Sequence, residues 1–386
     1  MDARRRHFSG PFARVTVANF FFFLNFASFF LLPLHVKALG GSETTVGLVM
    51  GSSGMASLAV LPLVGIGIDR FGRRRFFVAG ALGMSAAALG YLFVGTIGPA
   101  LYALRLAQGV SFAAAFTAAT TMAAELAPAD RRAQALGVFG ISTLLTHAIA
   151  PGLGEEIIHR GGFSALFVIA AICTLAPLPM LRGVPALHSV RESVAPVPWG
   201  VSRAQWVVIA TLLLAGMGFG AVMTFVPTYV RSQGLGRVAF FYGSYSVMAM
   251  LIRLAGAGVS DSVGRRATIV PALVTLAASI FALAWVGSVP ALVAAGALFG
   301  AAQGINYPTL HALLVDLTPP AHLGRSQALF NGAFNLGVMA SAFLFGPVAD
   351  HLGHRVMFGM AAFLPLAAAG LIYLAGVDDH ALPPGE

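Results

Sequence analysis

The sequence predicts an all-α membrane protein whose twelve membrane-spanning helices form two pseudo-symmetric six-helix halves. Of its 386 residues, 58% are hydrophobic and 10% are charged, so the chain has too little polar surface to cover a water-soluble globule. Its apolar stretches each run for about 20 residues or more, the length that a spanning helix needs. They lack the alternation of apolar and polar residues that marks the strands of a membrane barrel. We therefore expect the chain to lie in a lipid bilayer.

Short clusters of glycine, proline and arginine separate the apolar stretches, and each stretch is expected to form one helix. The expected spans are roughly 14–37, 44–68, 76–97, 99–125, 134–158, 162–181, 204–230, 238–260, 267–288, 290–315, 326–349 and 355–376. The first apolar run is long, and no small-residue cleavage site closes it, so it is expected to be an uncleaved helix and not a signal peptide.

A signature occurs twice, half a chain apart. GIGIDRFGRRR begins at Gly65 and GAGVSDSVGRR at Gly256, which puts Asp69 and Asp261 192 positions apart. Other pairs keep nearly this offset: Pro33 with Pro227, Gln108 with Gln303, Pro128 with Pro319, and Pro151 with Pro347. Such a duplication in so hydrophobic a chain indicates a transporter made of two copies of one module, with the substrate path between them.

The repeat and the breaks between spans predict the domain organisation. Residues 1–181 are expected to form an amino-terminal six-helix bundle, and residues 204–377 a carboxyl-terminal one. The connection 182–203 carries several prolines and is expected to be a cytoplasmic linker. Residues 378–386 are expected to form a cytoplasmic tail.

The net charge of +9 follows from where the arginines fall along the chain. If the amino terminus is placed in the cytoplasm, sixteen of the 23 basic residues fall in cytoplasmic segments and five in outer loops. The excess predicts that both termini are cytoplasmic, and it explains the charge without nucleic acid as a partner. One lysine against 22 arginines is typical of a GC-rich genome, which favours the inner membrane of a bacterium.

The loop from Gly65 to Arg75 matches, almost position for position, the signature between the second and third helices of the major facilitator superfamily. The chain resembles this family over essentially its whole length. In the family this loop latches the cytoplasmic side in one conformation, so the resemblance implies a gating role for Gly65, Asp69, Arg70, Gly72, Arg73, Asp261, Gly264 and Arg265. The second copy fits less well, because Ala257 and Ser262 replace the counterparts of Gly65 and Arg70.

The same loop can be interpreted without the family. A turn as tight as Asp-x-x-Gly-Arg-Arg needs the backbone freedom of glycine, which Gly72 and Gly264 supply. The two aspartates can accept hydrogen bonds from nearby arginines or from a helix amino terminus. The alternative, that the arginines only obey the positive-inside rule, leaves both aspartates and both glycines unexplained.

Two further motifs resemble those of proton-driven exporters in this family. Arg105, Gln108 and Gly109 follow the Arg-x-x-Gln-Gly pattern, in which the arginine is associated with coupling; a snorkelling arginine is the alternative. Its counterpart in the second half has Gly300 in place of the arginine, so only the first half is expected to carry the buried charge. Pro151 and Pro347 end the fifth and eleventh spans beside glycines, where a bend would suit closure of the outer side.

Polar residues deep inside spans are the candidates for substrate binding. They are Asn25, Ser28, Gln108, Thr143, Gln303, Asn306, His311, Asn331 and Asn335. Each of them taken alone fits a hydrogen bond between helices better than a ligand contact. As a set, they resemble the polar lining of such transporters.

Proton coupling lacks an obvious carboxylate, because no aspartate or glutamate lies in the middle of the first or seventh span. Histidine is the side chain that titrates near physiological pH. We therefore expect coupling to use His147 or Glu155 together with Arg105.

These observations predict a monomeric secondary active transporter that exports a small amphipathic molecule in exchange for protons. Proton-linked uptake of a metabolite such as an organic acid is the alternative. An enzyme is disfavoured because the chain has no His-Glu-x-x-His pattern and no phosphate-binding loop, and a sensor would usually append a soluble domain. No cofactor and no metal site is expected.

Overall fold

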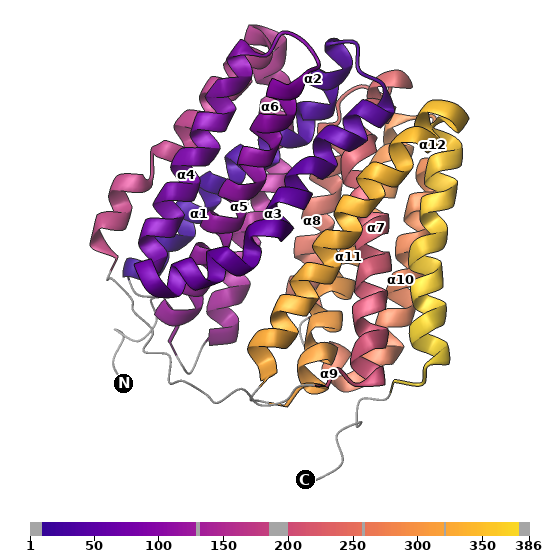
Figure 1. Cartoon of the computed structure of the whole chain (residues 1–386). Helices are drawn as coiled ribbons and strands as arrows, with labels where there is room; N and C mark the ends of the chain where they lie inside the picture. The colour runs from indigo at the N-terminus through magenta and orange to yellow at the C-terminus, as the bar shows by residue number, and fades with distance from the viewer. Residues whose placement is uncertain (1–9, 129–131, 185–199, 257–258, 320–321, 378–386) are drawn as a thin grey trace. The chain divides into compact units, whose positions relative to one another are not determined.

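The computed structural model describes residues 10–128, 132–184, 200–256, 259–319 and 322–377. The chain divides into two compact units, which are described separately (Figure 1). Unit 1 comprises Met1–His35 and Met55–Arg191, and unit 2 comprises Val36–Gly54 and Glu192–Glu386. Most of the expected linker and the whole expected tail lie outside the described residues.

All regular structure in the described part of the chain is helical, as expected for an all-α protein. The first half contains α1 (Gly10–Ser28), α2 (Leu32–Ala38), α3 (Glu43–Phe71), α4 (Arg73–Gly90), α5 (Pro99–Leu126) and α6 (Arg132–Leu175), with short 3-10 turns η2 (Phe29–Leu31), η3 (Tyr91–Phe93) and η5 (Leu178–Gly183). The second half contains α7 (Arg203–Ser232), α8 (Ala239–Ala255), α9 (Val259–Val263), α10 (Arg265–Leu283), α11 (Val289–Asp316) and α12 (Leu323–Leu374).

Eight helical segments of the described chain are long and apolar enough to cross a membrane. Two of them, Gln134–Gly183 and Arg325–Leu374, each cover two of the expected spans. The helix breaks between those spans at Gly162 (φ 72°) and at Gly353 (φ 80°), a backbone conformation that suits glycine. Spans 99–125 and 238–260 correspond to α5 and to α8, which has only 17 residues.

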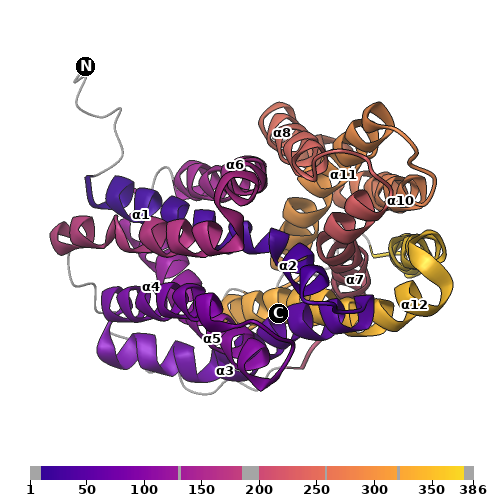
Figure 2. The same cartoon turned by 90° about the horizontal axis from the view of Figure 1, so that it is seen from above.

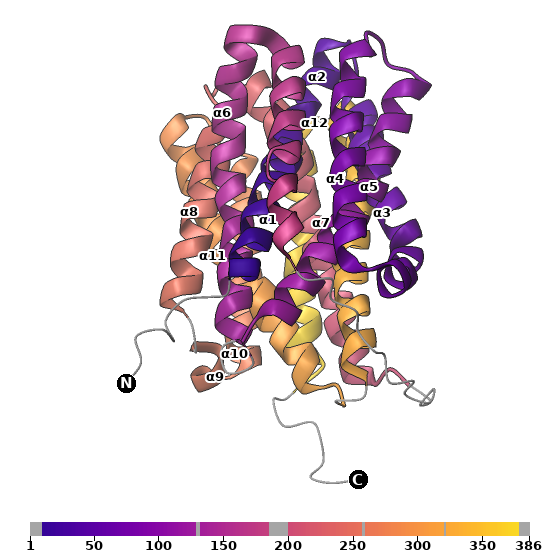
Figure 3. The same ribbon diagram turned by 90° about the vertical axis from the view of Figure 1, so that its left-hand side faces the viewer.

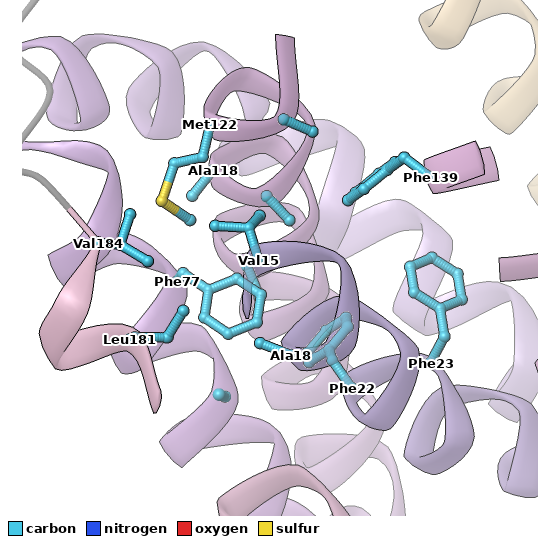
Figure 4. Packing of buried hydrophobic residues seen from close by; sticks show 14 of the residues in the cluster. Val15, Ala18, Phe22, Phe23, Phe77, Ala118, Met122, Phe139, Leu181 and Val184 are labelled. Carbon is cyan, nitrogen blue, oxygen red and sulfur yellow. The ribbon is translucent and has the colours of Figure 1, made fainter. Parts of the chain in front are cut away.

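Unit 1 is held together by aromatic rings packed against small side chains. Figure 4 shows Phe22 of α1 and Phe77 of α4 in this cluster, with Met122 of α5 on another side. Helices α4 and α5 approach closely because Gly80 has no side chain; a Cβ there would be 2.5 Å from the Ser111 carbonyl oxygen. The pairs α1 with α6 and α4 with α5 run side by side (Figure 3). Close backbone contact through small residues is how helices associate in lipid.

In unit 2, α7 packs along α12, and α8 packs along α11 (Figure 2). Glycines make both contacts possible. A Cβ on Gly337 of α12 would lie 2.2 Å from the Leu213 carbonyl oxygen, and one on Gly300 of α11 would lie 2.2 Å from the Tyr245 carbonyl oxygen. Helix α7 starts with a capping box in which Ser202 accepts from the Gln205 N–H and the Gln205 side chain accepts from the Ser202 N–H.

Helix α3 belongs to both units, because its residues up to Gly54 are in unit 2 and its residues from Met55 are in unit 1. Its first turns lie directly on α12. A Cβ on Gly47 would be 2.0 Å from the Ala342 carbonyl oxygen, and one on Gly346 would be 2.8 Å from Cα of Thr44. The contact is therefore made backbone to backbone.

Candidate functional site

The two copies of the repeated signature adopt the same turn. Gly72 has φ 91° and ψ 145° and precedes α4; Gly264 has φ 100° and ψ 145° and precedes α10. Residues other than glycine rarely adopt such backbone angles, so each turn requires its glycine. The repeat seen in the sequence is thus also a repeat of backbone geometry.

The first arginine after each glycine forms an ion pair with a carboxylate at the end of another helix. Arg73 is buried and pairs with Glu125 near the end of α5 at 2.6 Å. Arg265 pairs with Asp316 at the end of α11 at 3.1 Å and also donates to the Ser260 hydroxyl at 2.7 Å. Sequence reasoning missed these pairs, although Glu125 and Asp316 are themselves 191 positions apart.

The other residues expected to gate lie close to these turns. Gly65 lies in the last two turns of α3, and Asp69 and Arg70 are exposed at its end. Asp261 lies in the short helix α9, and its side chain is outside the described residues. Pro151 and Pro347 lie inside α6 and α12, each before the glycine that breaks the helix.

Asp350 of α12 caps the amino terminus of α3. One carboxylate oxygen accepts from the Glu43 N–H at 2.7 Å, and the other accepts from the Thr44 N–H at 2.7 Å and from the Thr44 hydroxyl at 2.5 Å. A carboxylate at this position satisfies N–H groups that the helix leaves free and interacts favourably with the helix dipole.

Glu43, the first residue of α3, is itself the centre of a buried polar cluster. Its carboxylate lies 3.3 Å from Lys37 Nζ and 3.6 Å from His354 Nε2, and it accepts a hydrogen bond of 2.9 Å from the Thr228 hydroxyl. Helices α2, α3, α7 and α12 thereby meet at one carboxylate. This cluster could not be predicted from the sequence, because its members share no motif and no spacing.

Arg105 and Gln108, expected to share a helix face, do lie together in unit 1. The Arg105 guanidinium donates to Gln108 Oε1 at 2.9 Å, and the Tyr91 hydroxyl donates to the same oxygen at 3.1 Å. All three side chains are buried, and the Tyr91 ring lies against Phe29 and Phe167. A buried guanidinium held in this way is fixed in place inside the helix bundle.

The remaining polar candidates of unit 1 mostly make bonds between or within helices. Asn25 donates to the Ala170 carbonyl of α6 at 2.9 Å, and Ser28 donates to the carbonyl one turn before it. Thr143 accepts from Asn19 at 3.3 Å. His147 lies edge-on to Phe30, with ring centroids 5.0 Å apart, and Glu155 is half-buried two turns further along α6.

In unit 2 the polar candidates gather where α11 faces α12. The Tyr307 hydroxyl donates to Asn331 Oδ1 at 3.4 Å, and His311 is hydrogen-bonded to Gln327. The Asn335 amide is exposed and bonds to the carbonyl one turn before it. Gln303 and Asn306 are buried in α11.

Unit 2 also contains an arginine inside a helix, and this one is half-buried. It is Arg253, in the last turn of α8, and its guanidinium interacts electrostatically with Tyr245 and Tyr307. The position equivalent to Arg105 is Gly300, so this charge does not belong to the repeated motif. In unit 2 the guanidinium comes from α8, the helix against which Gly300 packs.

The family model of the Major Facilitator Superfamily matches residues 15–289 and 239–386, so the matches together cover almost the whole chain. The chain belongs to the Major Facilitator Superfamily. It is 25% identical to the staphylopine export protein of Staphylococcus aureus over 94% of this chain and 96% of that protein. It is 26% identical to the uncharacterized MFS-type transporter YhhS of Escherichia coli over 91% of this chain and 88% of that protein.

Solved structures of superfamily transporters have the same fold. The D-xylose-proton symporter superposes with a TM-score of 0.79 at 16% identity, covering 94% of this chain and 97% of that one. The nucleoside transporter NupG superposes with a TM-score of 0.78 at 14% identity, covering 95% of this chain and all of that one. Together with the family match and the relatives above, this fold makes the chain a multi-pass membrane protein and a transporter of the superfamily, not an enzyme.

Proposed function

We propose that this superfamily member is a secondary active transporter of the bacterial inner membrane that exports a small amphipathic organic molecule in exchange for protons. Twelve spanning helices in two six-helix bundles, 1–181 and 204–377, carry out alternating access, with the linker, the tail and both termini in the cytoplasm. The full-length similarity to an export protein carries the proposed direction. A monomer suffices, because one chain contains both copies of the module.

Gating is assigned to the two repeated turns and to the two proline positions. The ion pairs Arg73–Glu125 and Arg265–Asp316 support this assignment, because each ties the start of one helix to the end of another beside a turn that only glycine tolerates. The Arg265–Asp316 pair is partly exposed, so breaking and reforming it costs little free energy, whereas the buried guanidinium of Arg73 makes the Arg73–Glu125 pair the stronger latch.

Substrate recognition is assigned to the polar residues inside the helices, with Arg105 as the charged member in unit 1. Gln108 Nε2 and Asn25 Oδ1 are buried without a hydrogen-bond partner among the described residues. Buried amide groups are usually satisfied, so a bound molecule or water is needed to complete them. Aromatic rings on the same helices suit the apolar part of an amphipathic compound; the ring centroids of Phe26 and Phe112, for example, lie 4.6 Å apart.

Coupling to protons is assigned to Arg105 with His147 or Glu155. The test uses purified protein in liposomes with an imposed pH gradient and a library of metabolites and drugs, whose movement is followed by mass spectrometry. We expect at least one compound to move only when the gradient is present. We expect the gradient-driven transport rate of the triple variant Arg105→Gln, His147→Gln, Glu155→Gln to be at least tenfold lower than that of the wild type.

The control for this test is the same triple variant in counterflow, where labelled substrate exchanges without a gradient. Substrate exchange that persists while gradient-driven transport is lost supports the coupling assignment. Gradient-driven transport that is unchanged in the triple variant contradicts it. Movement of an organic acid inward with protons, instead of outward, would favour the alternative of proton-linked uptake.

A further inference from the structure

Arg253 lies near the end of α8, with its Nε atom buried. It is two residues before the last residue, Ala255, and arginines near the end of a membrane helix usually extend to the nearer interface. Helical side chains lean toward the amino terminus, which for Arg253 is away from that end. Its guanidinium lies within electrostatic range of Tyr245 and Tyr307.

The surroundings of Arg253 are aromatic. Tyr245 packs against Phe219 and Phe299, with centroids 6.4 and 5.4 Å apart. Tyr307 packs against Phe334 at 5.2 Å, and Phe334 also contacts Phe219 at 5.5 Å. The rings from α7, α8, α11 and α12 thus form one continuous aromatic wall, which includes both tyrosines that lie within electrostatic range of Arg253.

The positive charge has no carboxylate partner among the side chains that the structure describes. The described carboxylates of unit 2 are engaged elsewhere: Glu43 with Lys37 and His354, Asp316 with Arg265, and Asp350 with the start of α3. The Arg253 Nε atom is buried and has no hydrogen-bond acceptor within the described chain. A charge in a membrane protein is costly when it is left uncompensated, so an anion is the natural complement.

Two buried amides beside Tyr307 also lack partners. Gln303 and Asn306 lie within about 100° of Tyr307 around α11. Both side chains are more than nine-tenths buried, and neither Gln303 Nε2 nor either amide atom of Asn306 has a hydrogen-bond partner in the described part of the protein. Unpaired amide donors on the helix that carries Tyr307 suit the oxygens of a carboxylate.

We infer that Arg253, Tyr245, Tyr307, Gln303 and Asn306 form an anion subsite in unit 2, which binds the carboxylate of an organic acid while the aromatic wall contacts its apolar body. This inference rests on the proposed transport function and narrows its substrate class to amphipathic acids. A phospholipid phosphate has related chemistry, and the experiment below separates the two sources.

The test measures equilibrium binding of radiolabelled 1-naphthylacetate to the purified full-length protein in phosphatidylcholine nanodiscs. We expect the unlabelled acid to compete at least tenfold better than its neutral amide, 1-naphthylacetamide, because only the acid pairs with the guanidinium. We expect Arg253→Gln to weaken acid binding about tenfold and to abolish the preference for the acid. Arg253→Lys keeps the charge but not the planar donor pair, so an intermediate loss is expected.

Arg231→Gln is the matched control, since Arg231 is an exposed arginine in the last turn of α7. This variant is expected to bind like the wild type. Size-exclusion profiles and thermal melting establish that each variant is folded, and Tyr307→Phe provides a second, milder change at the same site. Equal binding of acid and amide by the wild type, or an unchanged preference in Arg253→Gln, overturns the inference.

The same measurement in phosphatidylglycerol nanodiscs distinguishes the source of the anion. We expect the affinity for the acid to change less than threefold, because a lipid headgroup does not reach a subsite that points away from the helix end. If the wild type binds the acid at least tenfold more weakly in phosphatidylglycerol than in phosphatidylcholine, and Arg253→Gln does not, then Arg253 binds lipid and the inference is overturned. Binding needs no pH gradient, so these results are independent of whether the coupled transport proposed above is observed.

Discussion

Replacing Gly47 by valine is expected to separate the first turns of α3 from α12. A Cβ at this position would be 2.0 Å from the Ala342 carbonyl oxygen, and because the obstacle is backbone, no side chain can rotate to make room. Overpacking of this kind costs on the order of 1–3 kcal/mol, which disfavours the conformation in which the two helices touch. We therefore expect a loss of transport of at least tenfold in a protein that still folds.

The separation can be measured as a distance between spin labels. Cys173 is the only cysteine, so Cys173→Ser gives a background without thiols. Labels at Leu48 on α3 and Leu344 on α12 use side chains that are already exposed, at 43% and 57%. We expect the distance distribution to shift to longer values, or to broaden, when Gly47→Val is added.

Gly359→Val is the matched control, because a Cβ on this glycine of the same helix α12 has nothing within 4 Å. It is expected to leave the label distance and the transport rate close to those of the parent. An unchanged distance in Gly47→Val would mean that the two helices yield without parting, and it would contradict this prediction.

Replacing Arg73 by glutamine is expected to destabilise the protein far more than the equivalent change at Arg265. The Arg73 side chain is 3% exposed, and its loss leaves Glu125 without the guanidinium 2.6 Å away. Breaking a buried pair costs about 3–5 kcal/mol, and the partial exposure of Glu125 reduces this to about 2–3 kcal/mol. The pair Arg265–Asp316 is more exposed, so its loss is expected to cost about 0–1 kcal/mol.

The midpoints of thermal unfolding in detergent compare the two variants directly, since each carries the same substitution at the same position of the repeat. The double exchange Arg73→Glu, Glu125→Arg tests whether the pair itself matters. We expect it to recover part of the loss seen in Arg73→Gln. Equal midpoints for Arg73→Gln and Arg265→Gln would contradict the argument from burial.

The parts of this protein that could be predicted from the sequence are those set by local chemistry. The turn glycines Gly72 and Gly264 were predictable because their neighbours demand a tight turn, and the helices follow from long apolar runs. Arg105 and Gln108 were predictable as a pair because they lie one helical turn apart. Each of these inferences needs only residues that are near in the chain.

Contacts between distant segments could not be predicted in the same way. The carboxylate of Asp350 caps an N–H group that lies 307 positions earlier, and nothing in either segment marks the other. The cluster at Glu43 joins four helices whose faces become neighbours only in the folded unit. The neighbours of Arg253 could not be predicted for a related reason, since Tyr307 comes from α11, a helix that is distant in the chain.

The passage of α3 from unit 2 to unit 1 falls on the sequence Gly51-Ser-Ser-Gly54, which has mechanical consequences. Each glycine lowers helix stability by about 1 kcal/mol relative to alanine. Ser52 and Ser53 donate to the carbonyls of Val49 and Met50 in their own helix at 2.8 and 3.1 Å, a pattern that bends helices. Bending stiffness is therefore reduced at this crossing, as it is at Pro62 further along α3, so the helical turns on either side of the crossing can tilt without unwinding.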